Sequence, residues 1–118
     1  MARIEGKNFS KPDETRPFEK GKMDLVNIGG GQVGRATLQP GWKWSLHVKP
    51  IAKTQQCEAA HFGYMVSGKM HVVMADGSTA EAGPGEIVAI PSGHDAWVVG
   101  KEPVVFIDWT GASNYAKR

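Results

Sequence analysis

The sequence has a single cysteine, Cys57, among its 118 residues. One thiol cannot form a disulfide within the chain, so a hydrophobic core must stabilise the fold, and a chain of this length can build one. A free thiol also fits a reducing compartment, and we therefore expect a cytoplasmic protein.

Strong charge and long apolar runs are missing as well. The formal net charge is only +2 at pH 7, which gives little support to a nucleic-acid partner. No apolar run approaches the roughly 20 residues that cross a bilayer, and the first ten residues lack the apolar centre of a signal peptide. We expect neither a nucleic acid nor a membrane as a partner.

Turn-forming residues, in contrast, are plentiful, with 15 glycines and seven prolines. Few segments show a helical apolar period, so the pattern predicts roughly eight to ten short strands joined by turns, and hence an all-β fold. The strongest turn signal is Asp76-Gly77, which predicts a hairpin. Residues 42–48 alternate in character and predict another strand.

The chain divides into one domain and two flanking segments. Residues 1–24 are rich in charge and contain few large apolar side chains, which predicts an irregular N-terminal arm. Residues 25–112 form the β domain, and residues 113–118 are expected to be a loose C-terminal tail. Exposed strand edges and the phenylalanines of the arm, Phe9 and Phe18, favour a homodimer.

Groups able to bind a metal lie on two strand-like segments. Cys57 and His61 stand four residues apart, before an apolar run that ends at Gly68, and His94 follows a Pro91-Ser92-Gly93 turn. Residues four apart on one extended strand lie about 13 Å apart. Cys57 and His61 could share an ion only if the strand is bulged, bent or begins later than Cys57.

The second of these segments resembles a motif of the cupin family. That motif contains a glycine, a Pro-x-Gly turn and a ligand histidine, and Gly85, Pro91 and Gly93 match its first part. Ala96 stands where the histidine usually falls. His94 lies on the same strand face, two residues earlier, and can fill this position from a shifted place.

The first segment resembles the other cupin motif when spacings are counted forward from its first glycine, Gly41, and backward from its last, Gly68. His47 follows Gly41 after five residues, and His61 precedes Gly68 by six. His61 therefore occupies the place of the family's glutamate, and Cys57 occupies that of its second histidine. The longer stretch between His47 and Cys57 implies an inserted loop.

This resemblance implies a cupin jelly-roll β-barrel of two antiparallel sheets, with a divalent metal held by His47, Cys57, His61 and His94. Sulfur and nitrogen ligands favour zinc, with iron, manganese or nickel as alternatives. The implied function is to bind or transform a small molecule at the barrel mouth. The alternative is a non-catalytic ligand-sensing or structural dimer whose metal is structural or absent, so the sequence leaves open whether the protein is an enzyme.

Several of these residues also have a purely structural interpretation. Cys57 could be a small buried apolar side chain, and His47 could form a hydrogen bond at the barrel mouth. Asp95 could orient His94 or cap a turn, of which the turn is favoured. We expect His71 to face outward from its strand, and Tyr64 to lie on the opposite face of its strand from His61.

Overall fold

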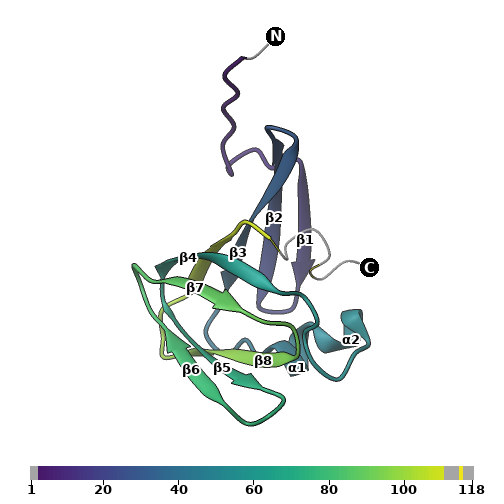
Figure 1. The fold of residues 1–118 in the computed structure, drawn as a ribbon, viewed down its shortest axis with the longest axis vertical. Helices are drawn as coiled ribbons and strands as arrows, with labels where there is room; N and C mark the ends of the chain where they lie inside the picture. The colour runs from purple at the N-terminus through teal and green to yellow at the C-terminus, as the bar shows by residue number, and fades with distance from the viewer. Residues whose placement is uncertain (1–2, 111–114, 116–118) are drawn as a thin grey trace.

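A computed structural model of the chain describes residues 3–110 and 115. These residues form nine strands and two short helices (Figure 1). The elements are β1 (Glu14–Phe18), β2 (Gly21–Ile28), β3 (Gly31–Leu38), α1 (Trp44–His47), α2 (Lys49–Ala52), β4 (His61–Ser67), β5 (Lys69–Met74), β6 (Thr79–Ala82), β7 (Ile87–Ile90), β8 (His94–Val99) and β9 (Val104–Asp108).

The strands form two antiparallel sheets. The larger sheet has the order β1-β2-β3-β9-β4-β7, and the smaller one has the order β6-β5-β8. Apolar side chains from both sheets, among them Leu25, Met65 and Phe106 from the larger and Met70 and Val98 from the smaller, belong to one buried cluster. The all-β prediction is confirmed, and the inner faces of both sheets border the same core.

Glycines make the tight turns between paired strands. Gly29 and Gly30, between β2 and β3, both have a positive φ, +59° and +78°, as a two-residue hairpin turn with the right twist requires. The predicted Asp76-Gly77 turn joins β5 to β6, and Asp76 Oδ1 accepts a hydrogen bond of 2.9 Å from the Ser78 backbone N–H. Turn chemistry therefore fixes these hairpins locally.

The N-terminal segment differs from the arm predicted for residues 1–24. β1 and the first part of β2 lie inside that range, and β1 pairs with β2 at the edge of the larger sheet. Arg16 and Asp24 in these strands are buried. The Asp24 carboxylate accepts hydrogen bonds from Thr15 and Arg35, so paired charges hold a segment that has few apolar side chains. The irregular part ends before Glu14.

Residues 42–48 form part of a helical segment instead of the predicted strand. Trp44 and Val48 are both buried, whereas Leu46 is exposed, which is a spacing of four that suits a helix as well as a strand. The Val48 N–H donates to the Trp44 carbonyl at 2.9 Å. Pro50 stands in the first turn of α2, where it is tolerated.

Within the described part of the chain, no helix is long and apolar enough to cross a membrane.

Gly63 sets the distance between β4 and β9. In the sheet register, Gly63 lies opposite Asp108. A Cβ atom at Gly63 would overlap the Ile107 carbonyl oxygen and come within 2.7 Å of the Phe106 ring. The absence of a side chain therefore lets β9 approach the strand that carries His61.

We expect Gly63→Ala to lower the free energy of unfolding by about 3 kcal/mol or more, because backbone must move to relieve the overlap. Urea denaturation measures this loss. Gly31→Ala is the matched control, because the nearest atom to its new Cβ would be 3.8 Å away. Equal stability of the two variants would contradict the close approach of β4 and β9.

Candidate metal centre

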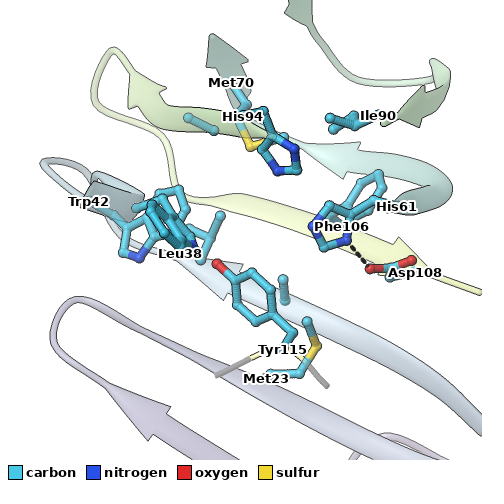
Figure 2. A pocket seen from close by; sticks show the side chains of 13 residues that line it. Met23, Leu38, Trp42, His61, Met70, Ile90, His94, Phe106, Asp108 and Tyr115 are labelled. Carbon is cyan, nitrogen blue, oxygen red and sulfur yellow. Dashed lines mark hydrogen bonds and ion pairs between the residues drawn. The ribbon is translucent and has the colours of Figure 1, made fainter. Parts of the chain in front are cut away.

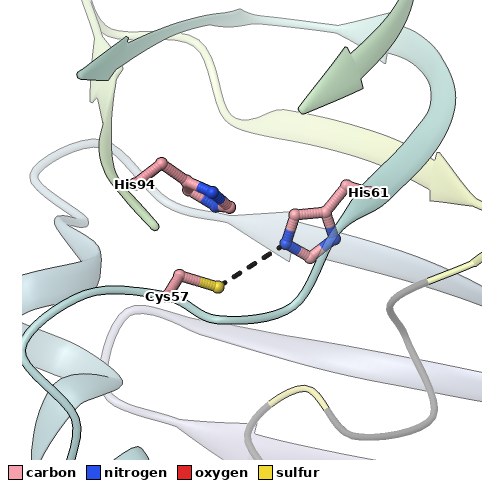
Figure 3. Close-up of side chains that lie close together, drawn as sticks. All are labelled: Cys57, His61 and His94. Carbon is pink, nitrogen blue, oxygen red and sulfur yellow. Dashed lines mark hydrogen bonds between the residues drawn. The ribbon is translucent and has the colours of Figure 1, made fainter. Parts of the chain in front are cut away.

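Cys57, His61 and His94 form a buried cluster of potential metal ligands (Figure 3). One donor atom from each residue lies within 4.8 Å of the other two. The Cys57 Sγ is 3.6 Å from the His61 Nε2, and the His61 and His94 rings are 5.3 Å apart between centroids. Three residues separated by up to 37 positions in sequence thus converge at one point.

The three residues come from different parts of the fold. His61 is the first residue of β4 in the larger sheet, and His94 is the first residue of β8 in the smaller sheet. Cys57 lies in the loop before β4 and forms an isolated backbone bridge with His94. Since Cys57 stands outside β4, the separation of about 13 Å expected along an extended strand does not arise.

Both imidazoles are oriented by hydrogen bonds from their Nδ1 atoms. His61 Nδ1 is 2.6 Å from Asp108 Oδ2, and the second Asp108 oxygen accepts a hydrogen bond from the Thr110 backbone N–H. His94 Nδ1 donates to the Pro91 carbonyl at 2.8 Å. These contacts leave the Nε2 atoms as the ligand atoms for a metal ion, an arrangement common around metal-bound histidines.

The fourth predicted ligand, His47, is not part of this cluster. His47 lies in α1, where its Nδ1 accepts a hydrogen bond of 3.0 Å from the Lys43 backbone N–H. Its Nε2 lies 4.0 Å from a Glu19 oxygen. The helical turn directs the imidazole to its own backbone, which the assumed strand over residues 42–48 did not anticipate.

Three other residues considered in the sequence lie outside the cluster and contact other parts of the fold or solvent. His71 stacks on Trp97 with ring centroids 4.7 Å apart and lies 3.2 Å from a Glu81 oxygen, facing outward from β5 as predicted.

Asp95 accepts hydrogen bonds from the backbone N–H groups of Ser45 and Ala96, so it connects α1 to β8. Tyr64 is 38% exposed while His61 is buried, which confirms their opposite faces.

Sequence reasoning missed two residues of the site, Asp108 and Tyr115. Asp108 follows Val104 and Phe106 on the inward face of β9, and all three are buried. An acidic residue in an inward position of an apolar strand is a usable signal, because a buried carboxylate needs a partner. Tyr115 lies in the tail predicted to be loose for residues 113–118, but it is only 7% exposed.

Cys57 and His61 shift each other's pKa values. Burial alone raises the pKa of the Cys57 thiol, but hydrogen bonds and positive charge from His61 and His94 outweigh it and lower the pKa to about 7. Burial alone lowers the pKa of His61, but the contacts with Asp108 and Cys57 raise it to about 9. Between these values the metal-free site favours a thiolate beside an imidazolium.

A small cavity lies beside the cluster (Figure 2). Its walls include His61 and His94, large apolar side chains such as Met70 and Phe106, and Tyr115. The space open to the centres of water-sized molecules is about 40 Å³, which is room for about three waters. Burial, together with the nearby Cys57 and Asp108, raises the pKa of Tyr115 well above its ordinary value, so its phenol stays protonated.

The spacing of Cys57 Sγ and His61 Nε2 is that of two ligands on one tetrahedral metal ion. Zinc bonds of about 2.3 Å to sulfur and about 2.0–2.1 Å to nitrogen, at a tetrahedral angle, place these two ligand atoms about 3.6 Å apart. The observed distance between Cys57 Sγ and His61 Nε2 is 3.6 Å. The described residues supply three such ligands, and a tetrahedral ion accepts a fourth.

Comparisons with solved structures identify the fold. Oxalate decarboxylase from Lactobacillus farciminis, solved as a formate complex, is 20% identical over 86% of this chain, with a TM-score of 0.60. Oxalate decarboxylase from Bacillus subtilis is 17% identical over 96% of this chain, with a TM-score of 0.62. This chain spans only 32% and 31% of those two chains. The fold is that of a cupin.

A neighbour of matching length shares the same arrangement. A protein of unknown function from Rhizobium leguminosarum is 20% identical over 92% of this chain and 99% of its own chain, with a TM-score of 0.61. No family model and no curated protein matches the sequence. Identities at this level show the fold alone, so the chemistry of this chain follows from its own residues.

We expect Asp108→Asn to lower the pKa of His61 from about 9 toward its ordinary value of 6.5, because the amide cannot stabilise the imidazolium as a carboxylate does. Imidazole ¹⁵N chemical shifts of the metal-free protein, followed against pH, measure this change. Glu81→Gln is the matched control, since Glu81 pairs with the outward-facing His71. An unchanged His61 titration in Asp108→Asn would show that the carboxylate has no such effect.

Proposed function

We propose that this protein is a metal-binding cupin in which Cys57, His61 and His94 hold one divalent ion beside a small ligand cavity. The observation that carries the proposal is the convergence of a thiol and two imidazoles within 4.8 Å in a buried position. The fixed Nδ1 contacts of both histidines support it, because they prepare the Nε2 atoms for coordination before the ion arrives.

Zinc is the ion that this donor set favours. A thiolate and two imidazoles suit zinc, whereas manganese prefers carboxylate and water oxygens; iron and nickel accept imidazole but gain less from sulfur. The Asp108 carboxylate is bonded to His61 Nδ1 and would orient this ligand without coordinating the ion. A thiol ligand must stay reduced, which supports a cytoplasmic location.

Three protein ligands leave one position for a water or a small molecule. A bound zinc ion would supply Lewis acidity, polarising a ligand oxygen or lowering the pKa of a bound water. Asp108 keeps the proton of His61 on Nδ1, and the apolar walls around Met70 and Phe106 limit the access of water. This open position favours ligand binding or catalysis over a purely structural ion, which normally has four protein ligands.

We expect the purified protein to retain about one zinc per chain. Cys57→Ser, His61→Ala and His94→Ala should each weaken zinc retention more than about 100-fold, since even the loss of an outer partner costs 10- to 100-fold. Plasma mass spectrometry after dialysis against a graded chelator series measures retention. His71→Ala and His47→Ala are the controls and should retain zinc like the parent protein.

The same variants define the results that would contradict the proposal. Equal retention in all five would remove the site, and loss of zinc in His47→Ala would restore the four-ligand set predicted from sequence. A structural ion is distinguished by cobalt substitution. If the fourth position is open, added azide should change the visible spectrum of the cobalt protein, whereas a closed site would give no change.

We also propose that two copies of the chain associate through the outer face of β4 and β7. Phe62, Tyr64 and Val66 of β4 alternate outward and are 38–50% exposed, and Ile87, opposite Tyr64 in β7, is 67% exposed. Contiguous apolar side chains on a sheet face are unusual in a monomer. β7 is also an edge strand of the larger sheet, so a second copy can cover face and edge together.

We expect light scattering at micromolar concentration to give the mass of two chains, and Ile87→Lys to give the mass of one, because the added charge cannot be buried in an apolar interface. Leu46→Lys is the matched control. Leu46 is similarly exposed, at 63%, but lies on α1. A single-chain mass for the parent protein would contradict the dimer.

A further inference from the structure

The indole N–H of Trp42 is a buried hydrogen-bond donor on the wall of the cavity. Among the residues that the structure describes, Trp42 Nε1 has no hydrogen-bond acceptor, although the side chain is only 2% exposed. Nearly all buried polar groups in folded proteins are paired, so an unpaired one calls for an explanation. Trp42 lines the cavity beside the metal cluster, where a bound molecule could provide the missing acceptor.

Tyr115 brings a second donor to the same cavity. Figure 2 shows its ring between the strands, with the hydroxyl directed toward the side of the cavity where Trp42 and Leu38 are drawn. The ring packs edge-on against His61 and Phe18, with centroids 5.6 and 6.0 Å away. Arg16 Nη1 donates to the Tyr115 carbonyl oxygen at 3.0 Å, so both ends of the residue are held.

Three other polar side chains of the cavity wall have partners inside the protein. His61 and Asp108 are bonded to each other, and His94 donates to the Pro91 carbonyl. The Trp42 N–H lacks an acceptor among the described residues, and the Tyr115 hydroxyl is directed to the same side of the cavity, so both groups can meet a ligand there. An indole N–H only donates, and a protonated phenol can donate as well, so the complementary group is an acceptor oxygen.

We propose that Trp42 Nε1–H and the Tyr115 hydroxyl bind one oxygen of a short aliphatic monocarboxylate in this cavity. The inference rests on the proposed function, since a divalent ion at His61 and His94 would face the carboxylate and balance its charge. Hydrogen bonds to an anionic oxygen are stronger than those to a neutral one. The cavity of about 40 Å³ has room for about three water-sized groups, so acetate is about the largest such ligand that it can hold.

The test is a titration of the zinc-loaded protein with sodium acetate, followed by the ¹H–¹⁵N signal of the Trp42 indole and by calorimetry. We expect a saturable shift of this signal. Tyr115→Phe keeps the ring and removes one donor, so it should weaken acetate binding about tenfold or more. Tyr64→Phe, which removes an exposed hydroxyl on the outer face, should leave the affinity unchanged. Benzoate, too large for the cavity, should not shift the signal.

The possible results separate this inference from the proposed function. Zinc retention is measured on the same samples by plasma mass spectrometry. A protein that holds zinc but shows no acetate-dependent indole shift overturns the carboxylate site and leaves the metal site intact. Equal acetate affinity in Tyr115→Phe, or equal binding of benzoate, also overturns it. Absence of any divalent metal from the parent protein overturns the proposed function and, with it, the charge balance on which the carboxylate site rests.

Discussion

The backbone bridge between Cys57 and His94 is the interaction on which the site depends. The Cys57 N–H donates to the His94 carbonyl at 2.8 Å, and the Gly93 N–H donates to the Cys57 carbonyl at 2.7 Å. These bonds attach the loop before β4 to the first residue of β8. They bring the thiol beside an imidazole from each sheet, so a metal ion bound there would connect the two sheets through side chains.

The second constraint is the close pairing of β4 with β9. Gly63 allows the approach, and His61 Nδ1 and Asp108 Oδ2 then lie 2.6 Å apart in a buried position. The result is a continuous chain of carboxylate, imidazole and thiol. Without an ion, such a chain satisfies its own charges by proton transfer from the thiol to the imidazole; with an ion, the same carboxylate would increase the basicity of the ligand.

Local signals in the sequence predicted most of the fold, whereas the site depended on contacts between distant segments. Turn residues such as Asp76-Gly77 fix hairpins within a few positions, and Cys57, His61 and His94 were found by spacing and resemblance. His47 was misplaced because the spacing of four between Trp44 and Val48 fits a strand and a helical turn alike, and the exposed Leu46 distinguishes the two only in the structure. Asp108 and Tyr115 could not be assigned to the site, because their partners are 47 and 54 positions away at His61.

The buried N–H of Trp42, which has no acceptor among the described residues, distinguishes this cavity from a simple gap in packing. Leaving a buried N–H unpaired costs about 1–3 kcal/mol, and the fold holds Trp42 firmly, since its carbonyl accepts a hydrogen bond of 3.0 Å from the Val98 N–H. A tryptophan that served packing alone could be replaced by phenylalanine without that cost. The cost is recovered when an acceptor oxygen enters, so a ligand with an oxygen at this position binds more tightly than an apolar one of equal size.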